Sequence, residues 1–159
     1  MFGILKKRLN NIIALDQKAM TTTILKDPSL QDMIVNLNQM QMEAGIGADG
    51  NSLPLYADDP YFKSPKAAAA YQAFKKHVSP NQSKPEGVMD FYIDGTFHST
   101  LKAVPIADGV IVRSDSDIAQ DIQDKTSNKA LGLDKDSVGQ IIPYCRESFI
   151  TLTRKAIFK

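Results

Sequence analysis

Apolar residues recur at helical spacing through the first 44 residues of the chain. They fall mostly at steps of three or four, with polar side chains between them: Leu5, Leu9, Ile12, Ile13, Met20 and Ile24. This first helix is expected to end before Asp27-Pro28, because the residue before a proline disfavours helical geometry. Asp27 then caps a second helix with Pro28 in its first turn, and Leu37 lies on the apolar stripe of that helix. The pattern leaves open whether the two helices form a hairpin or one extended arm.

A third helix is predicted to begin after residues 45–63, which are irregular and rich in glycine at their start. Ser64 suits the cap position of this helix and Pro65 its first turn. The helix passes through four consecutive alanines to about His77, and a polar loop with two prolines follows it.

From residue 88 the apolar pattern changes to a period of two. Alternation is present in residues 88–93 and again in residues 97–103. Asp-Gly pairs at 94–95 and 108–109 are turn signals, and the second precedes the short apolar run 110–112. Three strands joined by short turns predict an antiparallel meander.

The C-terminal part returns to helical spacing. Ser114 and Asp117 resemble a capping box in front of a short helix around residues 118–122. Pro143 lies inside the last helix and predicts a kink or a fresh start there. The apolar stripe of this last helix consists of Ile141, Ile142, Cys145, Phe149 and Leu152.

The order of helices, then strands, then helices predicts an α+β fold. It would combine N-terminal amphipathic helices, a small antiparallel meander and C-terminal helices. At 159 residues the chain suits one compact unit, since two halves would each lack a sizeable core. Within it, we expect residues 1–44 to form a helical arm or hairpin and residues 45–159 an α+β core.

The overall charge argues against a nucleic-acid-binding role for the whole domain. The chain carries 19 basic and 18 acidic residues, whereas phosphate-binding proteins usually show a clear basic excess. The run Lys6, Lys7 and Arg8 still gives the first helix a basic character, which suits a solvated face or contact with acidic protein or passing DNA. Neither a secretory signal nor an apolar run of about 20 residues is present, so we expect a protein made in the cytoplasm with no membrane span.

Side chains with catalytic potential are few and scattered. His77 and His98 lie on different predicted elements, and the single Cys145 lies on an apolar stripe typical of an inert thiol. Asp90 and Asp94, four residues apart, would be the carboxylates of a metal-dependent hydrolase, but turn chemistry already explains Asp94-Gly95. We therefore predict no catalytic residue, no metal site and no cofactor, and a protein that is not an enzyme.

Several local stretches resemble the neck and tail-completion proteins of tailed phages. Asn36-Leu37-Asn38-Gln39-Met40-Gln41 leads into Gly45-Ile46-Gly47-Ala48-Asp49-Gly50, and Leu55-Tyr56 precedes a lysine-containing helix. The run from Asp90 to Ser99 contains the turn Asp94, Gly95, Thr96 and Phe97, close to the T-G-x-F turn of that group, and Leu131-Gly132-Leu133 follows later. The resemblance covers roughly residues 35–135 and departs at the turn, where Thr-Gly is usual.

The resemblance implies a structural virion protein of the neck or tail region. It would be one subunit of a homo-oligomeric ring that joins the head to the tail and contacts portal, adaptor or tail-tube proteins, with DNA passing nearby. Apolar stripes on the terminal helices would carry the contacts between subunits, unless they fill the protein's own core. The candidate interface residues are Leu5, Leu9, Ile12, Leu37, Phe149 and Leu152. The alternatives are a DNA-binding or packaging-related accessory factor of the phage and, ranked lower, the small metal-dependent hydrolase.

Overall fold

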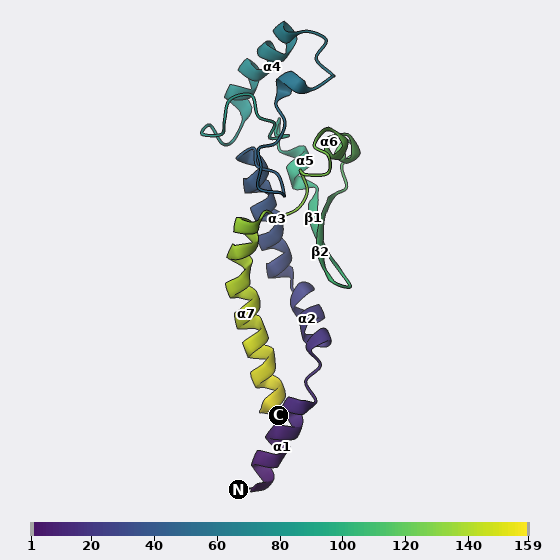
Figure 1. Cartoon of the computed structure of the whole chain (residues 1–159), viewed down its shortest axis with the longest axis vertical. Helices are drawn as coiled ribbons and strands as arrows, with labels where there is room; N and C mark the ends of the chain where they lie inside the picture. The colour runs from purple at the N-terminus through teal and green to yellow at the C-terminus, as the bar shows by residue number, and fades with distance from the viewer. Residues whose placement is uncertain (1, 159) are drawn as a thin grey trace.

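The computed structural model describes residues 2–158, except for the side chains of residues 2, 3 and 5, and it has the predicted α+β fold (Figure 1). Four helices form a long arm, the sheet lies alongside the middle of this arm, and the remaining helices gather at the end opposite both termini. The elements are α1 (Phe2–Ile13), α2 (Gln17–Leu25), α3 (Pro28–Glu43), the 3-10 helix η1 (Tyr56–Asp58), α4 (Pro65–Val78), α5 (Thr96–Ser99), β1 (Leu101–Ile106), β2 (Gly109–Ser114), α6 (Ala119–Lys125) and α7 (Lys135–Ile157).

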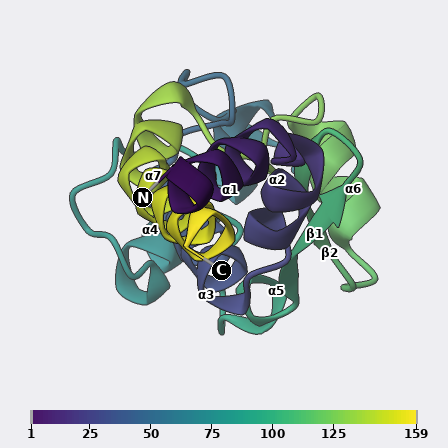
Figure 2. The same ribbon diagram turned by 90° about the horizontal axis from the view of Figure 1, so that it is seen from below.

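The arm consists of α1, α2 and α3 in series, with α7 running back along all three (Figures 1 and 2). The single first helix predicted from the sequence is wrong, because α1 and α2 are separated by a break at residues 14–16. Asp16 explains the break, since its side chain accepts a hydrogen bond from the amide of Ala19 at 2.9 Å and so caps a new helix. The predicted end before Asp27-Pro28 is confirmed, because α2 finishes at Leu25.

Two of the three predicted helix caps are confirmed. Asp27 accepts a hydrogen bond from the amide of Ser29 at 2.9 Å, and Ser64 accepts one from the amide of Ala67 at 3.2 Å. The capping box at Ser114 is wrong: α6 begins at residue 119 without a side-chain cap. The Ser114 hydroxyl instead shares a hydrogen bond with the hydroxyl of Thr100 at 2.6 Å.

The sheet has two antiparallel strands, β1 and β2, joined by the predicted turn at 108–109. The three-stranded meander is wrong, since residues 89–95 are irregular and residues 96–99 form the short helix α5. Two features prevent a strand there. Asp90, on the expected polar face, is fully buried, and Phe91 has a left-handed φ of 52° that turns the chain.

Pro143 does not produce a fresh start, because α7 continues through it as one helix of 23 residues. Pro143 and Gly139, whose carbonyl the missing amide would have bonded, are both exposed. The Gly139 carbonyl is thus open to solvent in place of its lost hydrogen-bond partner, and the helix continues.

Two apolar clusters form the core, and α3 contributes to both. Leu30 and Ile34 of α3 pack with Ile24 and Ala103 in the arm, and side chains of α7 cover them. Met42, near the other end of α3, packs in the larger cluster that joins η1, α5, β1 and α6. Helix α3 ends at Glu43, and α7 of the C-terminal part packs along the arm.

Candidate functional site

Helix α1 carries an apolar face that the rest of the protein leaves exposed. Leu9 and Ile12, two of the predicted interface residues, are 50% and 48% exposed. Ile4 and Ile13 on the same helix are 63% and 78% exposed. The side chain of Leu5 lies outside the described residues. Leu9 and Ile12 are therefore available for contact with another molecule.

The remaining interface candidates occupy different environments. Leu37 is only 8% exposed, so the alternative of packing in the protein's own core applies to it. Leu152 is half-buried against the cluster formed by α2, α3 and β1. Phe149, at 37% exposed, still presents part of its ring at the surface of α7.

The predicted turn at Asp94-Gly95 exists, but it begins helix α5 and does not join two strands. The exposed carboxylate of Asp94 accepts a hydrogen bond from the amide of Thr96 at 2.9 Å, which lowers the pKa of Asp94. Gly95 has a φ of 83°, a left-handed conformation that glycine adopts readily. Phe97 is 4% exposed and anchors the turn in the larger apolar cluster.

Asp90 forms a buried polar centre that the sequence analysis did not predict. Its carboxylate lies 2.6 Å from the ammonium of Lys75 in α4 and 3.6 Å from that of Lys84 in the following loop. The hydroxyl of Tyr56 donates a hydrogen bond to it at 3.0 Å, and the hydroxyl of Ser79 donates another. One carboxylate thus ties together η1, the end of α4 and the loop after it.

Two ammonium groups share this one carboxylate, and the pKa shifts reflect the imbalance. Burial raises the pKa of Asp90, but hydrogen bonds from Lys75, Ser79 and the Tyr92 amide outweigh it and hold the pKa below its usual value. The pKa of Lys75 is lowered, mainly because burial disfavours the ammonium and partly because Lys84 repels it, while Asp90 acts in the opposite direction. The cluster holds one more positive charge than negative charge when all three groups are ionised.

His98, in α5, lies against the backbone of Asp90 and is 4% exposed. Its Nε2 is 3.0 Å from the backbone carbonyl of Asp90, and its ring stacks edge-on against Tyr92. Its Nδ1 has no hydrogen-bond partner and lies 3.7 Å from a carboxylate oxygen of Glu43. Burial lowers the pKa of His98, so its neutral form is favoured, as expected of a structural histidine.

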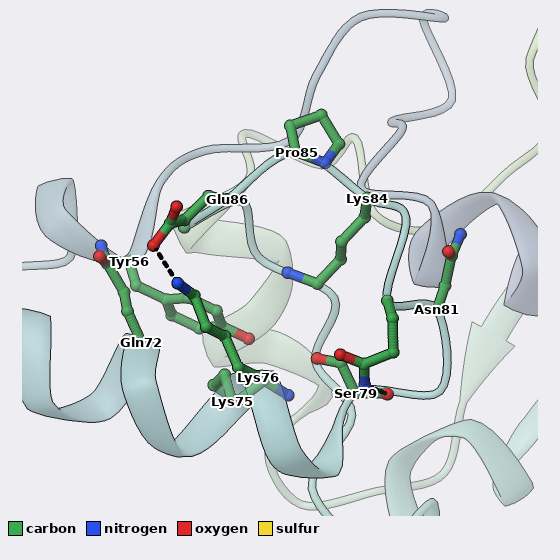
Figure 3. A pocket seen from close by; sticks show the side chains of 11 residues that line it. Tyr56, Gln72, Lys75, Lys76, Ser79, Asn81, Lys84, Pro85 and Glu86 are labelled. Carbon is green, nitrogen blue, oxygen red and sulfur yellow. Dashed lines mark hydrogen bonds and ion pairs between the residues drawn. The ribbon is translucent and has the colours of Figure 1, made fainter.

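A pocket of about 250 Å³ opens beside the Asp90 cluster, between α4 and the loop 79–87 (Figure 3). Its charged lining residues are three lysines and one glutamate, and the Lys84 side chain reaches down from the loop toward the ring of Tyr56. The lining residues are Tyr56, Gln72, Lys75, Lys76, Ser79, Asn81, Gln82, Lys84, Pro85, Glu86 and Gly87. Asp90 is not among them, because it lies behind Lys75, Ser79 and Lys84.

A second pocket, of about 370 Å³, is apolar at its base and acidic at its edge. Aromatic and branched side chains make up most of its lining: Tyr56, Tyr61, Phe62, Tyr71, Met89, Phe91, Ile93, Ile118 and Ile122. At the edge, Lys125 pairs with both Asp59 at 3.2 Å and Asp121 at 2.9 Å. An adjoining hollow adds Asp58 and Asp124, so four aspartates and one lysine line the two hollows. We call this second pocket, with the adjoining hollow, the acidic groove.

The structure does not bring the hydrolase candidates Asp90 and Asp94 into one site. Asp90 is fully buried and paired with Lys75, whereas Asp94 is exposed and caps a turn. Within residues 2–158, no group of three or more histidine, cysteine, aspartate or glutamate side chains is arranged to hold a metal ion.

Comparison with known proteins does not add a relationship: no protein-family model, no curated protein and no solved structure matches the chain. In the part of the chain that the structure describes, every helix is too short or too polar to cross a membrane.

Proposed function

We propose that this protein is a non-enzymatic structural subunit of a homo-oligomeric ring at the head–tail joint of a tailed phage. The observation that carries the oligomeric part of the proposal is the exposed apolar face of α1, formed by Leu9, Ile12 and Ile13, which fall within about 100° of one another around the helix. The phage assignment rests on the sequence resemblance over residues 35–135. Portal, adaptor or tail-tube proteins are then the expected neighbours of the ring.

The apolar face of α1 is large enough to contribute to a stable contact. Complete burial of one leucine or isoleucine contributes roughly 1.5–3 kcal/mol. Three such side chains, each about half exposed or more, would contribute on the order of 3 kcal/mol before the entropic cost of association is subtracted. Contiguous exposed apolar patches rimmed by polar residues mark interaction sites in soluble proteins.

The occupant we assign to this face is a second copy of the chain, through its acidic groove. Helix α1 combines the apolar face with the exposed basic residues Lys6, Lys7 and Arg8. The acidic groove combines an apolar base with an acidic edge, so its charge and polarity complement those of α1. The two surfaces lie at opposite ends of the elongated molecule, α1 at one end and α6 near the other (Figure 1). A contact between unlike surfaces of identical subunits is head-to-tail and closes into a ring when the rotation allows it.

The test is the native mass of the purified protein, alone and mixed with the portal protein encoded in the same genome. The expected result is a defined oligomer above the 17.5 kDa of one chain, formed alone or on the portal. The double variant Leu9→Gln/Ile12→Gln should remain at 17.5 kDa, because it makes the apolar face polar. Ile106→Gln is the matched control, since Ile106 is also about half exposed, at 49%, but lies on the β-hairpin away from α1.

A wild-type chain that stays monomeric at high concentration and in the presence of the portal would contradict the proposal. If the double variant assembled as well as the wild type, the oligomer would stand but α1 would be excluded as its contact. Salt-sensitive binding to duplex DNA that is lost on replacing Lys6 and Arg8 would favour the DNA-binding accessory factor instead.

A further inference from the structure

We infer that the basic pocket between α4 and the loop 79–87 binds a small phosphate-bearing anion, either inorganic phosphate or a phosphate monoester (Figure 3). This site is independent of the α1 contact and does not depend on the proposed ring.

The charge of the pocket favours an anion. Three lysines, Lys75, Lys76 and Lys84, line it, together with a single acidic residue, Glu86. Glu86 is already paired with Lys76 at 2.6 Å on the exposed rim. Among the residues that the structure describes, the carboxylate paired with Lys75 and Lys84 is that of Asp90, which lies behind the pocket wall. One positive charge therefore remains uncompensated at the pocket, where Lys75 is only 2% exposed.

Both inner lysines are held in place before any ligand arrives. Lys75 donates a hydrogen bond to the backbone carbonyl of Tyr92, and Lys84 donates one to that of Val88. An ammonium group has three protons to donate. Lys75 uses two of them, on Tyr92 and Asp90, and one remains. The Lys84 side chain is 9% exposed and makes only a longer, 3.6 Å contact with Asp90, so it also retains donor capacity.

An anion would relieve an electrostatic cost that the cluster carries without one. The pKa of Lys75 is lowered by its burial and by the neighbouring charge of Lys84. A bound anion attracts both ammonium groups and reduces their mutual repulsion, so its binding stabilises the folded protein. A phosphate group suits this arrangement because its several oxygens accept hydrogen bonds from more than one donor at once.

The size of the pocket limits the ligand. Its volume of about 250 Å³ is below the roughly 300–1,000 Å³ of pockets that hold drug-sized molecules. Polar side chains of Gln72, Asn81 and Gln82 complete the lining and suit the hydroxyls of a small monoester. The ligand class is thus a phosphate ion or a phosphorylated molecule of a few carbon atoms.

The first experiment titrates the full chain with sodium phosphate and with glycerol phosphate, with sodium chloride at matched ionic strength as the reference. Thermal unfolding and amide chemical shifts are the readouts. Phosphate should raise the melting temperature above that in chloride, and the largest shift changes should fall on Ser79 and Gly87, which line the pocket. Tighter binding of glycerol phosphate would assign an organic phosphate, and tighter binding of inorganic phosphate would assign the free ion.

The deciding variant is Lys84→Gln, which keeps the Lys75–Asp90 pair intact and removes the uncompensated charge. We expect at least a tenfold loss of phosphate affinity in this variant. Lys102→Gln, an exposed lysine on β1 that pairs with Asp115, should bind as the wild type does. Equal stabilisation by phosphate and chloride, or unchanged affinity in Lys84→Gln, would overturn the proposal. Because Lys84 also donates to the Val88 carbonyl and lies near Asp90, circular dichroism of the variant establishes that it is folded before binding is compared.

Discussion

At the scale of single residues, Asp90 has the most consequences for the fold. Its carboxylate is the common partner of Lys75, Lys84, Ser79 and Tyr56, which come from three separate segments. A buried ion pair adds little net stability compared with a well-packed apolar pair, but removal of one partner leaves the other charge uncompensated. Loss of Asp90 should therefore lower the free energy of unfolding strongly, even though the intact ion pair adds little to it.

Replacement of Asp90 by asparagine should lower the free energy of unfolding by about 3 kcal/mol, because two buried ammonium groups lose their only carboxylate. Asp94→Asn is the matched control, since Asp94 is an exposed aspartate in the same segment whose turn an asparagine can also form. Its expected effect is within about 0.5 kcal/mol. Urea denaturation of both variants at pH 7 measures the difference, and equal effects would show that the Asp90 cluster does not hold the fold.

His98 predicts a loss of stability in mild acid. Its pKa is lowered in the folded protein by burial, against a hydrogen bond with the carbonyl of Asp90 and the nearby charges of Glu43 and Asp90. Below the ordinary histidine pKa of about 6.5, the unfolded chain binds a proton that the folded protein does not. The contribution of His98 to the free energy of unfolding is thus fully present above about pH 6.5, and it is lost as the pH is lowered below that value.

The measurement is the melting temperature from pH 7.5 to pH 5.5 of the wild type, of His98→Gln and of His77→Gln. Replacement of His98 should flatten this part of the profile, because the buried titrating group is gone. His77 is exposed on α4, so its variant should follow the wild type. A wild-type profile that is already flat in this range would show that His98 titrates as an ordinary histidine.

At the scale of secondary-structure elements, local signals predicted the helix starts at Asp27 and Ser64 but missed the break between α1 and α2 and failed for the irregular segment 89–95. Asp27 and Ser64 cap their helices as predicted, because a cap depends only on a side chain and an amide two or three residues later. The alternation in residues 88–93 is as regular as in a strand, but Asp90 is buried among partners from η1, α4 and the loop. Contacts across 11 to 34 residues of sequence override the local period there.

The separation of these residues in sequence also explains why the sequence did not predict the Asp90 cluster and the basic pocket beside it. Lys75 reads as one of several lysines on an alanine-rich helix, and Lys84 as part of a polar loop. Only the packing of α4 against η1 and the irregular segment shows that the two ammonium groups converge on one carboxylate. The exposed residues Leu9 and Ile12 were predictable, because helical spacing alone places them on one stripe.

Gly45, directly after α3, joins the arm to the body at close range. Its φ is 73°, and an added β-carbon would lie 2.5 Å from a methyl group of Val88, which is in the core. Gly45→Ala should therefore lower the free energy of unfolding by about 2–3 kcal/mol, through left-handed strain and the steric overlap together. Gly109→Ala, in the β-hairpin, is the control, since a β-carbon there meets nothing within 4 Å. A mild effect at Gly45 would mean that Val88 moves aside easily.

At the scale of the whole molecule, stability is distributed unevenly along the arm. Six residues of α3 are buried, and Asp27 at its start accepts a hydrogen bond from the hydroxyl of Tyr144 in α7 at 2.8 Å. Helix α1 instead contacts the end of α7 through surface interactions. The guanidinium of Arg8 lies 4.8 Å from the centre of the Phe158 ring, and the side-chain amide of Asn11 donates to the carbonyl of Ile157 at 3.3 Å. A helix of 12 residues held mainly in this way is marginal by itself.

Hydrogen exchange should resolve this gradient and connect it to assembly. In the monomer, amides of α1 should exchange at least tenfold faster than those of α3, because local opening of α1 exposes little apolar surface that was buried. In the assembled protein, protection should rise across α1, since a neighbouring subunit would cover Leu9 and Ile12. The tip of the β-hairpin, residues 107–108, is exposed in the single chain and should exchange equally in both states. Protection that rises in the hairpin and not in α1 would place the contact away from α1, and the head-to-tail arrangement would have to be abandoned.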